Sequence, residues 1–150
     1  MDLTIKEYDR YYELYEKSEL VYKTQEQSFC FGTKTICVTD KDNTIYSKII
    51  CNSRIELYEQ NINISIKAKN IFSTTYSFYY FDNEYTMIKK NKKLYELKRN
   101  GILIADFIYG FNEFYHHGFY NLSINEINEF ENSLFYFNIF LVKIGRFYTD

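Results

Sequence analysis

Positive charge gathers in one short stretch of a chain that is acidic overall. The stretch is "IKKNKKLYELKR", residues 88–99, in a 150-residue chain of formal net charge −2. Clustered basic residues contribute about 1 kcal/mol each to binding near an anionic lipid surface. We therefore predict a site here for an anionic membrane surface or a macromolecular partner; the alternative is a pair of solvated hairpin turns. The candidate binding residues are Lys89, Lys90, Lys92, Lys93, Lys98 and Arg99.

The two histidines, His116 and His117, are the next residues that could do chemistry. Adjacent residues of a strand point to opposite faces, so this pair could act together only in a loop. In a loop, Glu113 could join them as a metal ligand. The cluster lacks the regular spacing of a zinc site, so we expect a solvated loop and no metal.

Asp40, Asp42 and Asn43 match the start of a calcium-binding loop. The EF-hand pattern then needs Gly at its sixth position and Glu at its twelfth, where this chain has Ile45 and Cys51. We therefore interpret this segment as a hairpin turn, in which Asp and Asn side chains bond to nearby backbone groups.

The three cysteines, Cys30, Cys37 and Cys51, form no C-x-x-C pair. They lie in strand-like stretches, which favours buried thiols over a catalytic nucleophile. P-loop, dinucleotide-binding and zinc-protease motifs are absent from the sequence. We therefore predict a non-enzymatic protein without catalytic residues, cofactor or metal. An odd cysteine number and a charged N-terminus without the apolar core of a signal peptide favour a cytoplasmic location.

The composition fits a single globular domain spanning residues 1–150. Hydrophobic residues make up 46% and charged residues 25%, an ordinary balance for a folded protein. A net charge of −2 gives no strong sign of nucleic-acid binding. The excess of Tyr, Phe, Ile, Asn and Lys, all encoded by AT-rich codons, indicates an AT-rich genome such as that of a low-GC bacterium, its phage or a virus.

Secondary structure must position these residues, and the first segment is predicted to be a helix over residues 4–19. Thr4 and Glu7 fit a capping box, which satisfies free backbone N–H groups at a helix start. We expect the aromatic face of this helix to pack on the domain, with partner binding as the alternative. Aromatic side chains recur at helical spacings of three and four at Tyr8, Tyr11, Tyr12 and Tyr15.

Residues 28–122 are predicted to form a meandering antiparallel sheet. Apolar and polar residues alternate with period two, most clearly in "INISIKAK" (62–69), as in a strand with one wet face. Asn100-Gly101 is the strongest hairpin-turn signal, because both residues tolerate positive φ. Seven or more such strands curl into a barrel or a two-layer arrangement.

The last segment is predicted to be a helix over residues 124–148, with Ser123 and Glu126 as a second capping box. Its apolar run from Leu134 to Val142 is too short for a membrane span, which needs about 20 residues. A short helix that is apolar on all sides is a buried helix. We therefore expect the curved sheet to enclose it, with a re-entrant or membrane-surface helix as the alternative. The residues expected to be almost fully buried are Leu134, Phe137 and Leu141.

Three segments carry a resemblance to a known family. They are "TKTICVTDKDNTIYSKI" (strand, Asp-containing turn, strand), "YELKRNGILIADF" (a hairpin with a Gly turn) and "FYNLSINEINEFENSLFYFNIFLVKIG" (strand, polar break, apolar helix). Their order resembles the Tubby C-terminal-like superfamily, in particular the small bacterial relatives of LURP-one and scramblase proteins. The resemblance implies a barrel around a hydrophobic helix and a binding domain that meets membrane phosphoinositides in some relatives. It transfers no catalytic residues.

The sequence therefore predicts an α+β protein made mainly of antiparallel strands. A curled meander sheet or barrel encloses a hydrophobic C-terminal helix, and an extra N-terminal helix precedes it. The first functional hypothesis is a non-enzymatic binding module of Tubby-like architecture that contacts anionic lipid or a protein partner through the basic hairpin. The rival is a small immunity protein, or a phage or viral antagonist, that inhibits a partner protein by occluding its surface.

Overall fold

The computed structural model describes residues 2–30, 33–50, 54–68 and 75–147. Within these residues, thirteen strands form one sheet in which every neighbouring pair is antiparallel, and one helix follows. The sheet order is β7-β6-β5-β4-β3-β2-β1-β13-β12-β11-β10-β9-β8. The elements are β1 (Leu3–Glu7), β2 (Tyr12–Glu16), β3 (Glu19–Cys30), β4 (Thr33–Thr39), β5 (Ile45–Ile50), β6 (Arg54–Leu57), β7 (Ile62–Ser65), β8 (Lys67–Ala68), β9 (Thr75–Tyr80), β10 (Asn83–Asn91), β11 (Leu94–Arg99), β12 (Ile102–Asn112), β13 (His117–Ile124) and α1 (Ser133–Phe147).

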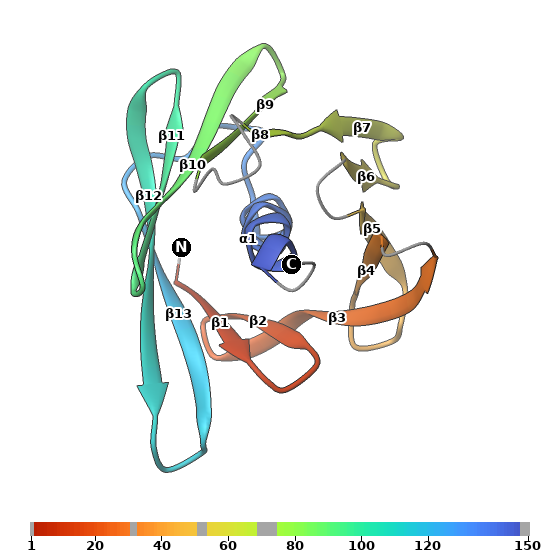
Figure 1. The fold of residues 1–150 in the computed structure, drawn as a ribbon, viewed down its shortest axis with the longest axis vertical. Helices are drawn as coiled ribbons and strands as arrows, with labels where there is room; N and C mark the ends of the chain where they lie inside the picture. The colour runs from red at the N-terminus through yellow and green to blue at the C-terminus, as the bar shows by residue number, and fades with distance from the viewer. Residues whose placement is uncertain (1, 31–32, 51–53, 69–74, 148–150) are drawn as a thin grey trace.

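The two ends of the sheet come together and nearly close it into a barrel (Figure 1). β7 pairs with β6, β8 pairs with β9, and only Ile66 separates β7 from β8 along the chain. One short stretch of chain therefore bridges the two edges of the sheet. This arrangement confirms the predicted curled meander, because sequential hairpins account for all pairings except that of β1 with β13.

Helix α1 lies at the centre of the ring of strands (Figure 1). Every side chain from Phe135 to Val142 is buried, so the strands cover the whole circumference of this part of the helix. Phe137 and Leu141 are fully buried, as predicted, whereas Leu134 at the first turn is only partly buried. In the described part of the chain, no helix is both long and apolar enough to cross a membrane.

The predicted N-terminal helix over residues 4–19 is wrong. This segment forms β1, β2 and the start of β3, and the turn between β1 and β2 closes with a bond from the Tyr8 N–H to the Tyr11 carbonyl, 2.9 Å. Leu3 and Ile5 are fully buried on one face of β1. Apolar residues at every second position, with β-branched and aromatic residues among them, favour a strand when neighbouring strands can pack against it. The tyrosines that repeat at spacings of three and four therefore lie in β2 and in the turn between β1 and β2.

The last helix begins later than the predicted boundary at residue 124. Ser123 lies in β13, and α1 begins at Ser133. The cap is Asn132, whose Oδ1 accepts a bond of 3.0 Å from the N–H of Phe135, as an N-cap side chain does. The segment between β13 and α1 is held by polar contacts described below.

The hairpin at Asn100-Gly101 is confirmed, since both residues have positive φ, 50° and 83°. The "INISIKAK" strand is confirmed for Ile62–Ser65, where Ile64 is buried and Asn63 and Ser65 are exposed. The predicted Asp40 turn also holds, because Oδ1 of Asp40 accepts from the N–H groups of Asp42 and Thr44 at 2.9 and 3.0 Å. Cys37 is a buried free thiol, whereas Cys51 lies outside the described residues.

Candidate functional site

The six predicted binding residues fall into two groups at opposite ends of β11. Lys89, Lys90, Lys92 and Lys93 surround the turn between β10 and β11, and we call these four residues the lysine turn. Lys98 and Arg99 lie at the far end of β11. Arg99 lies six positions after Lys93 along the strand, which is about 20 Å at the rise of an antiparallel strand. The structure therefore brings the four lysines together and leaves the other two apart from them.

Two lysines of the turn contact neighbouring side chains. Lys89 Nζ lies 5.9 Å from the centre of the Tyr95 ring, and Lys90 Nζ lies 3.6 Å from Oε1 of Glu96. Lys92 and Lys93 are exposed, and neither takes part in an ion pair within the described residues. The turn itself is fixed by Asn91, whose Oδ1 accepts from the Lys93 N–H at 2.9 Å. The turn therefore presents Lys92 and Lys93 to solvent.

Arg99 is held by the protein's own carboxylates. Its side chain is only 12% exposed, and its guanidinium contacts Glu131 through Nη1 and Glu126 through Nη2, the latter at 3.0 Å. Because these contacts occupy the guanidinium, Arg99 joins β11 to the segment that leads into α1. The exposed part of the predicted binding set is therefore the lysine turn.

Glu131 is the centre of this internal network. Its Oε1 accepts from the Tyr85 hydroxyl at 2.7 Å, and its Oε2 accepts from the Tyr136 hydroxyl at 3.0 Å and the Asn128 N–H at 3.1 Å. Burial alone would raise the pKa of the Glu131 carboxyl, but the hydrogen bonds from Tyr85 and Arg99 lower it below its ordinary value. The carboxylate is therefore charged and fully partnered, which is typical of a structural group.

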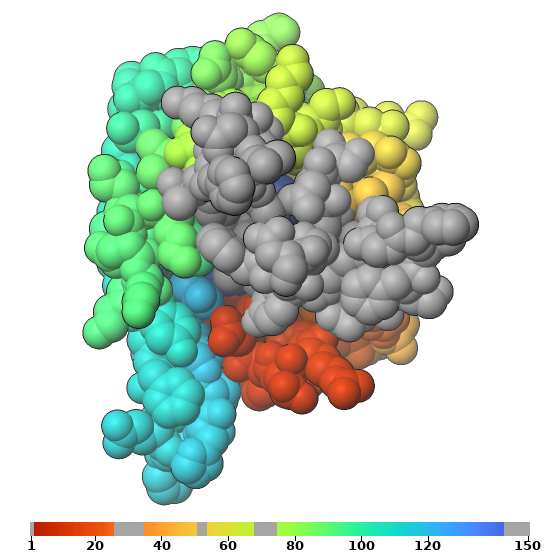
Figure 2. Space-filling model, viewed as in Figure 1, coloured from red at the N-terminus to blue at the C-terminus, as the bar shows by residue number. Residues whose placement is uncertain are grey.

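A second feature lies at the same end of the barrel as the lysine turn. The hairpin β12–β13 extends beyond the barrel wall, as Figure 2 shows, and its tip lies beside the β1–β2 turn. An open cleft of about 460 Å³ separates the two, and we call it the hairpin cleft. Its lining residues are Glu7, Tyr8, Asp9, Tyr109, Phe111, Tyr115, His116, His117 and Gly118.

The register of β1, β13 and β12 determines which side chains line one side of the hairpin cleft. Glu7 of β1 pairs with Gly118 of β13, and Gly118 pairs in turn with Phe111 of β12, so these three residues form one row on one face. The Tyr109 ring covers Gly118, because a Cβ at Gly118 would lie 2.7 Å from that ring. The absence of a side chain at Gly118 therefore leaves the space that the hydroxyl end of the Tyr109 ring occupies.

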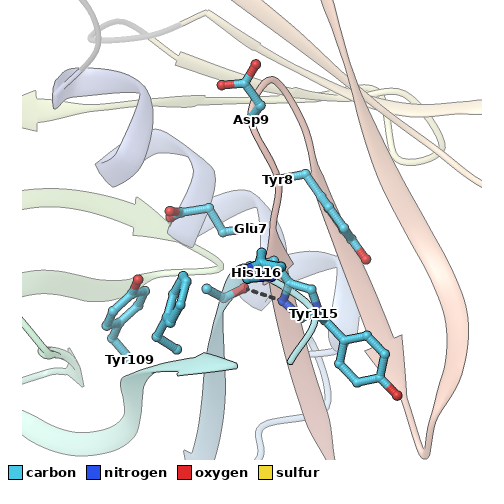
Figure 3. Close-up of a pocket in the computed structure, with 9 residues that line it drawn as sticks. Glu7, Tyr8, Asp9, Tyr109, Tyr115 and His116 are labelled. Atoms are coloured by element: carbon cyan, nitrogen blue, oxygen red, sulfur yellow. Dashed lines mark hydrogen bonds between the residues drawn. The ribbon is translucent and has the colours of Figure 1, made fainter. Parts of the chain in front are cut away.

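Tyr8 and His117 belong to the other side of the cleft. Figure 3 shows Glu7 and Tyr109 on one side and Tyr8 and Tyr115 on the other, with His116 between them. The His117 ring lies 5.3 Å from the Tyr8 ring and 5.9 Å from the Tyr115 ring, measured between centroids. The cleft is thus walled by aromatic rings on both sides.

Electrostatics in the hairpin cleft come from its two carboxylates. Burial raises the pKa of the Glu7 carboxyl, and that of Tyr109 is raised by burial and by the neighbouring charge of Glu7. Asp9 lies 3.9 Å from Arg10, but both side chains are almost completely exposed, so this pair is weak. Glu7 forms no ion pair among the described residues.

The solvated loop expected for the histidines holds for the exposed His116, whereas His117 is partly buried at the start of β13. His116 is in the turn with φ 56°, and His117 begins β13 with its Nδ1 3.1 Å from the Gly118 carbonyl oxygen. Glu113 is exposed and does not line the cleft. No group of three or more His, Cys, Asp or Glu side chains in the described part of the chain could hold a metal ion.

Sequence reasoning missed the hairpin cleft, because Glu7 and Phe111 are far apart in the chain and were assigned to a helix and a strand. The pairing of β1 with β13 brings them together. The alternation of Phe107, Tyr109 and Phe111 was the available signal, because it continues the inward face of β12 past the barrel wall. Comparisons of the chain with known protein families, with curated proteins and with solved structures find no match.

Proposed function

We propose that this protein is a non-enzymatic binding module of Tubby-like architecture, and that its lysine turn contacts an anionic membrane surface. The observation that carries the proposal is the position of Lys92 and Lys93. Both are exposed at the apex of a hairpin, without an ion pair in the described residues, and Lys89 and Lys90 flank them. Four basic residues near a charged bilayer contribute about 4 kcal/mol, at roughly 1 kcal/mol each.

The interior of the barrel supports a binding role rather than catalysis. Helix α1 fills it, and two of its buried polar groups bond to the surrounding strands, whereas Nδ2 of Asn138 has no partner among the described residues. Ser47 Oγ donates to Oδ1 of Asn138 at 2.7 Å, and the Tyr76 hydroxyl donates to the Ile139 carbonyl. A barrel that is packed with its own helix leaves its outer surface and its ends for contact with a ligand.

Exposed aromatic residues lie at the same end of the barrel as the lysine turn, further out along the hairpin β12–β13. The Tyr109 N–H donates to the Lys93 carbonyl at 2.8 Å, so the turn adjoins the base of the protruding hairpin. At the hairpin tip, Phe114 is 83% and Tyr115 66% exposed. Aromatic side chains favour the interface between water and lipid. Lysines and aromatic rings at one end of the barrel are the combination that a peripheral membrane protein needs.

Sedimentation with vesicles tests the proposal. The protein is expected to sediment with phosphoinositide-containing vesicles at low salt and much less at high salt, because salt screens the contact. Replacing Lys89, Lys90, Lys92 and Lys93 with Gln is expected to abolish sedimentation. Absence of binding at low salt would overturn the proposal.

A matched control variant separates the lysine turn from net charge. Replacing Lys17, Lys23, Lys41 and Lys67 with Gln removes the same charge from other parts of the surface. This variant is expected to keep most of the binding. Equal loss in both variants would show that overall charge, and not the turn, governs association.

The rival function is inhibition of a partner protein, as an immunity protein or a phage or viral antagonist. It is favoured by the exposed aromatic residues of the same end, because Tyr is a frequent anchor at protein interfaces. Tyr8 and Tyr11 stack at 4.6 Å in the β1–β2 turn, and Tyr11 is exposed. A direct binding measurement with the product of a neighbouring gene, with and without Tyr11→Ser, tests this alternative.

A further inference from the structure

We infer that the hairpin cleft binds the organic cation of a zwitterionic phospholipid head group, held between the Glu7 carboxylate and the rings of Tyr109 and Phe111. The phosphate of the same head group contacts the lysine turn. The contact of the phosphate with the lysine turn rests on the proposed function. The inference adds the chemistry of the lipid head group to that function.

The Glu7 side of the cleft has the chemistry that a quaternary ammonium requires. Aromatic faces attract a cation within about 6 Å of the ring centre, and a nearby carboxylate adds charge attraction. Glu7 and Phe111 lie in one cross-strand row with Gly118 between them, and the Tyr109 ring covers that glycine. Two rings and one carboxylate therefore face a common space.

The charge of the lining favours a cation. Its charged carboxylates are Glu7 and Asp9, and none of the described residues that line it is Lys or Arg. Glu7 has no cation of its own within the described residues, whereas the exposed Arg10 lies 3.9 Å from Asp9. A ligand cation in the cleft would supply the partner that Glu7 lacks.

The neighbouring lysines indicate that the ligand also carries an anion. The Tyr109 N–H donates to the Lys93 carbonyl, so the lysine turn adjoins the strand that carries the Tyr109 ring. Adjacent strands are about 4.8 Å apart, so the backbone of Lys93 lies close to that of Tyr109, and the lysines border the cleft without lining it. A lone cation would be repelled by these lysines, whereas a phosphate linked to it would be attracted. At about 460 Å³, the cleft has room for such a head group.

Titration of the isotope-labelled protein with phosphocholine, followed by NMR, tests the inference. Binding is expected to shift the Gly118 amide and to move the choline methyl signal upfield, because the methyl groups lie over an aromatic ring. Two related probes identify the groups that matter. Inorganic phosphate lacks the cation, and 3,3-dimethylbutyl phosphate replaces the ammonium by a neutral carbon. Neither is expected to shift the Gly118 amide at the same concentration, and an equal shift with the neutral analogue would overturn the inference.

Variants test the residues. Glu7→Gln and Tyr109→Leu are each expected to weaken phosphocholine affinity by about tenfold, the loss of roughly 1.4 kcal/mol of cation attraction. Glu113→Gln is the matched control, because it removes a carboxylate from the same hairpin outside the cleft. An equal effect of Glu113→Gln would overturn the inference. Glu7→Gln keeps the test valid if Tyr109→Leu does not fold.

Two further arms separate this inference from the proposed function. Choline alone tests the cleft without the lysines and is expected to bind more weakly than phosphocholine while shifting the same Gly118 amide. The four-lysine variant is expected to retain choline binding while losing vesicle binding. N-acetylarginine amide represents a protein side chain, and tighter binding of it than of phosphocholine would contradict the head-group assignment. Vesicle binding without any response to phosphocholine would sink the inference and leave the proposed function intact.

Discussion

The Tyr85 hydroxyl donates a hydrogen bond of 2.7 Å to Oε1 of the buried Glu131, which joins strand β10 to the residue that precedes the helix cap. Arg99 contacts the same oxygen from β11. Together these contacts fix the point at which the chain leaves the barrel wall and enters the interior. The network is therefore the anchor of the enclosed helix.

Glu131→Gln is expected to destabilise the protein by about 3 kcal/mol, because it leaves the largely buried Arg99 without its main partner. Urea unfolding measures the change. The control is Lys90→Gln, which removes an exposed contact with Glu96 and is expected to cost less than about 1 kcal/mol. A cost for Glu131→Gln no larger than that of the control would contradict the anchoring role.

Stability is expected to fall in acid through the same carboxyl. Its pKa is lower in the folded protein than the value of about 4.3 for an unfolded Glu. The folded state therefore binds the proton less readily, and the stabilisation is complete above the unfolded pKa and lost as pH falls through the folded pKa. Urea unfolding of the natural protein and of Glu131→Gln between pH 6 and pH 3 measures how much of the loss of stability in acid comes from this carboxyl. A natural protein whose acid dependence matches the variant would show that Glu131 does not contribute.

Phe137→Ala is expected to destabilise the protein by about 3–5 kcal/mol, since the ring is fully buried and its removal leaves a cavity. Leu134→Ala is the comparison in the same helix, and it is expected to cost less because Leu134 is only partly buried. Thermal or urea unfolding of both variants gives the difference. A chain truncated after Asn132 is expected not to fold, and a stable truncated barrel would show that the helix is dispensable.

Ser47→Ala is expected to cost about 1–3 kcal/mol, because it leaves Oδ1 of the buried Asn138 without its donor. Asn138→Leu combined with Ser47→Ala removes both partners, and the double variant is expected to recover part of that loss. Urea unfolding of the single and double variants gives the coupling between the two positions. Additive costs would mean that the hydrogen bond does not link the helix to β5.

The hairpin turns and the enclosed helix could be predicted from the sequence because each depends on local signals. Asn100-Gly101 supplies positive φ, and an apolar run from Leu134 to Val142 is too short to span a membrane and has no polar face to expose. The N-terminal segment was misassigned because tyrosines in β2 and in the turn before it repeat at helical spacing. The pairing of β1 with the distant strand β13, in which Leu3 lies opposite Leu122, identifies the segment as a strand.

The candidate surfaces were predictable to different degrees. The lysine turn is contiguous in sequence, so the pattern found it, but the ion pairs that hold Arg99 come from Glu126 and Glu131 on another segment. The hairpin cleft depends on the register that joins Glu7, Gly118 and Phe111 across three strands. Such a row cannot be identified from spacing along the chain.

Contact of the lysine turn with lipid is the central claim, and paramagnetic broadening in phosphoinositide-containing nanodiscs with spin-labelled lipid tests it most directly. Amide signals at residues 91–93 and 113–116 are expected to broaden most, because the lysine turn and the tip of β12–β13 lie at the same end of the barrel. Broadening centred on the opposite turns at Asp82 and Asn100, or no broadening in the presence of bound nanodiscs, would contradict the account.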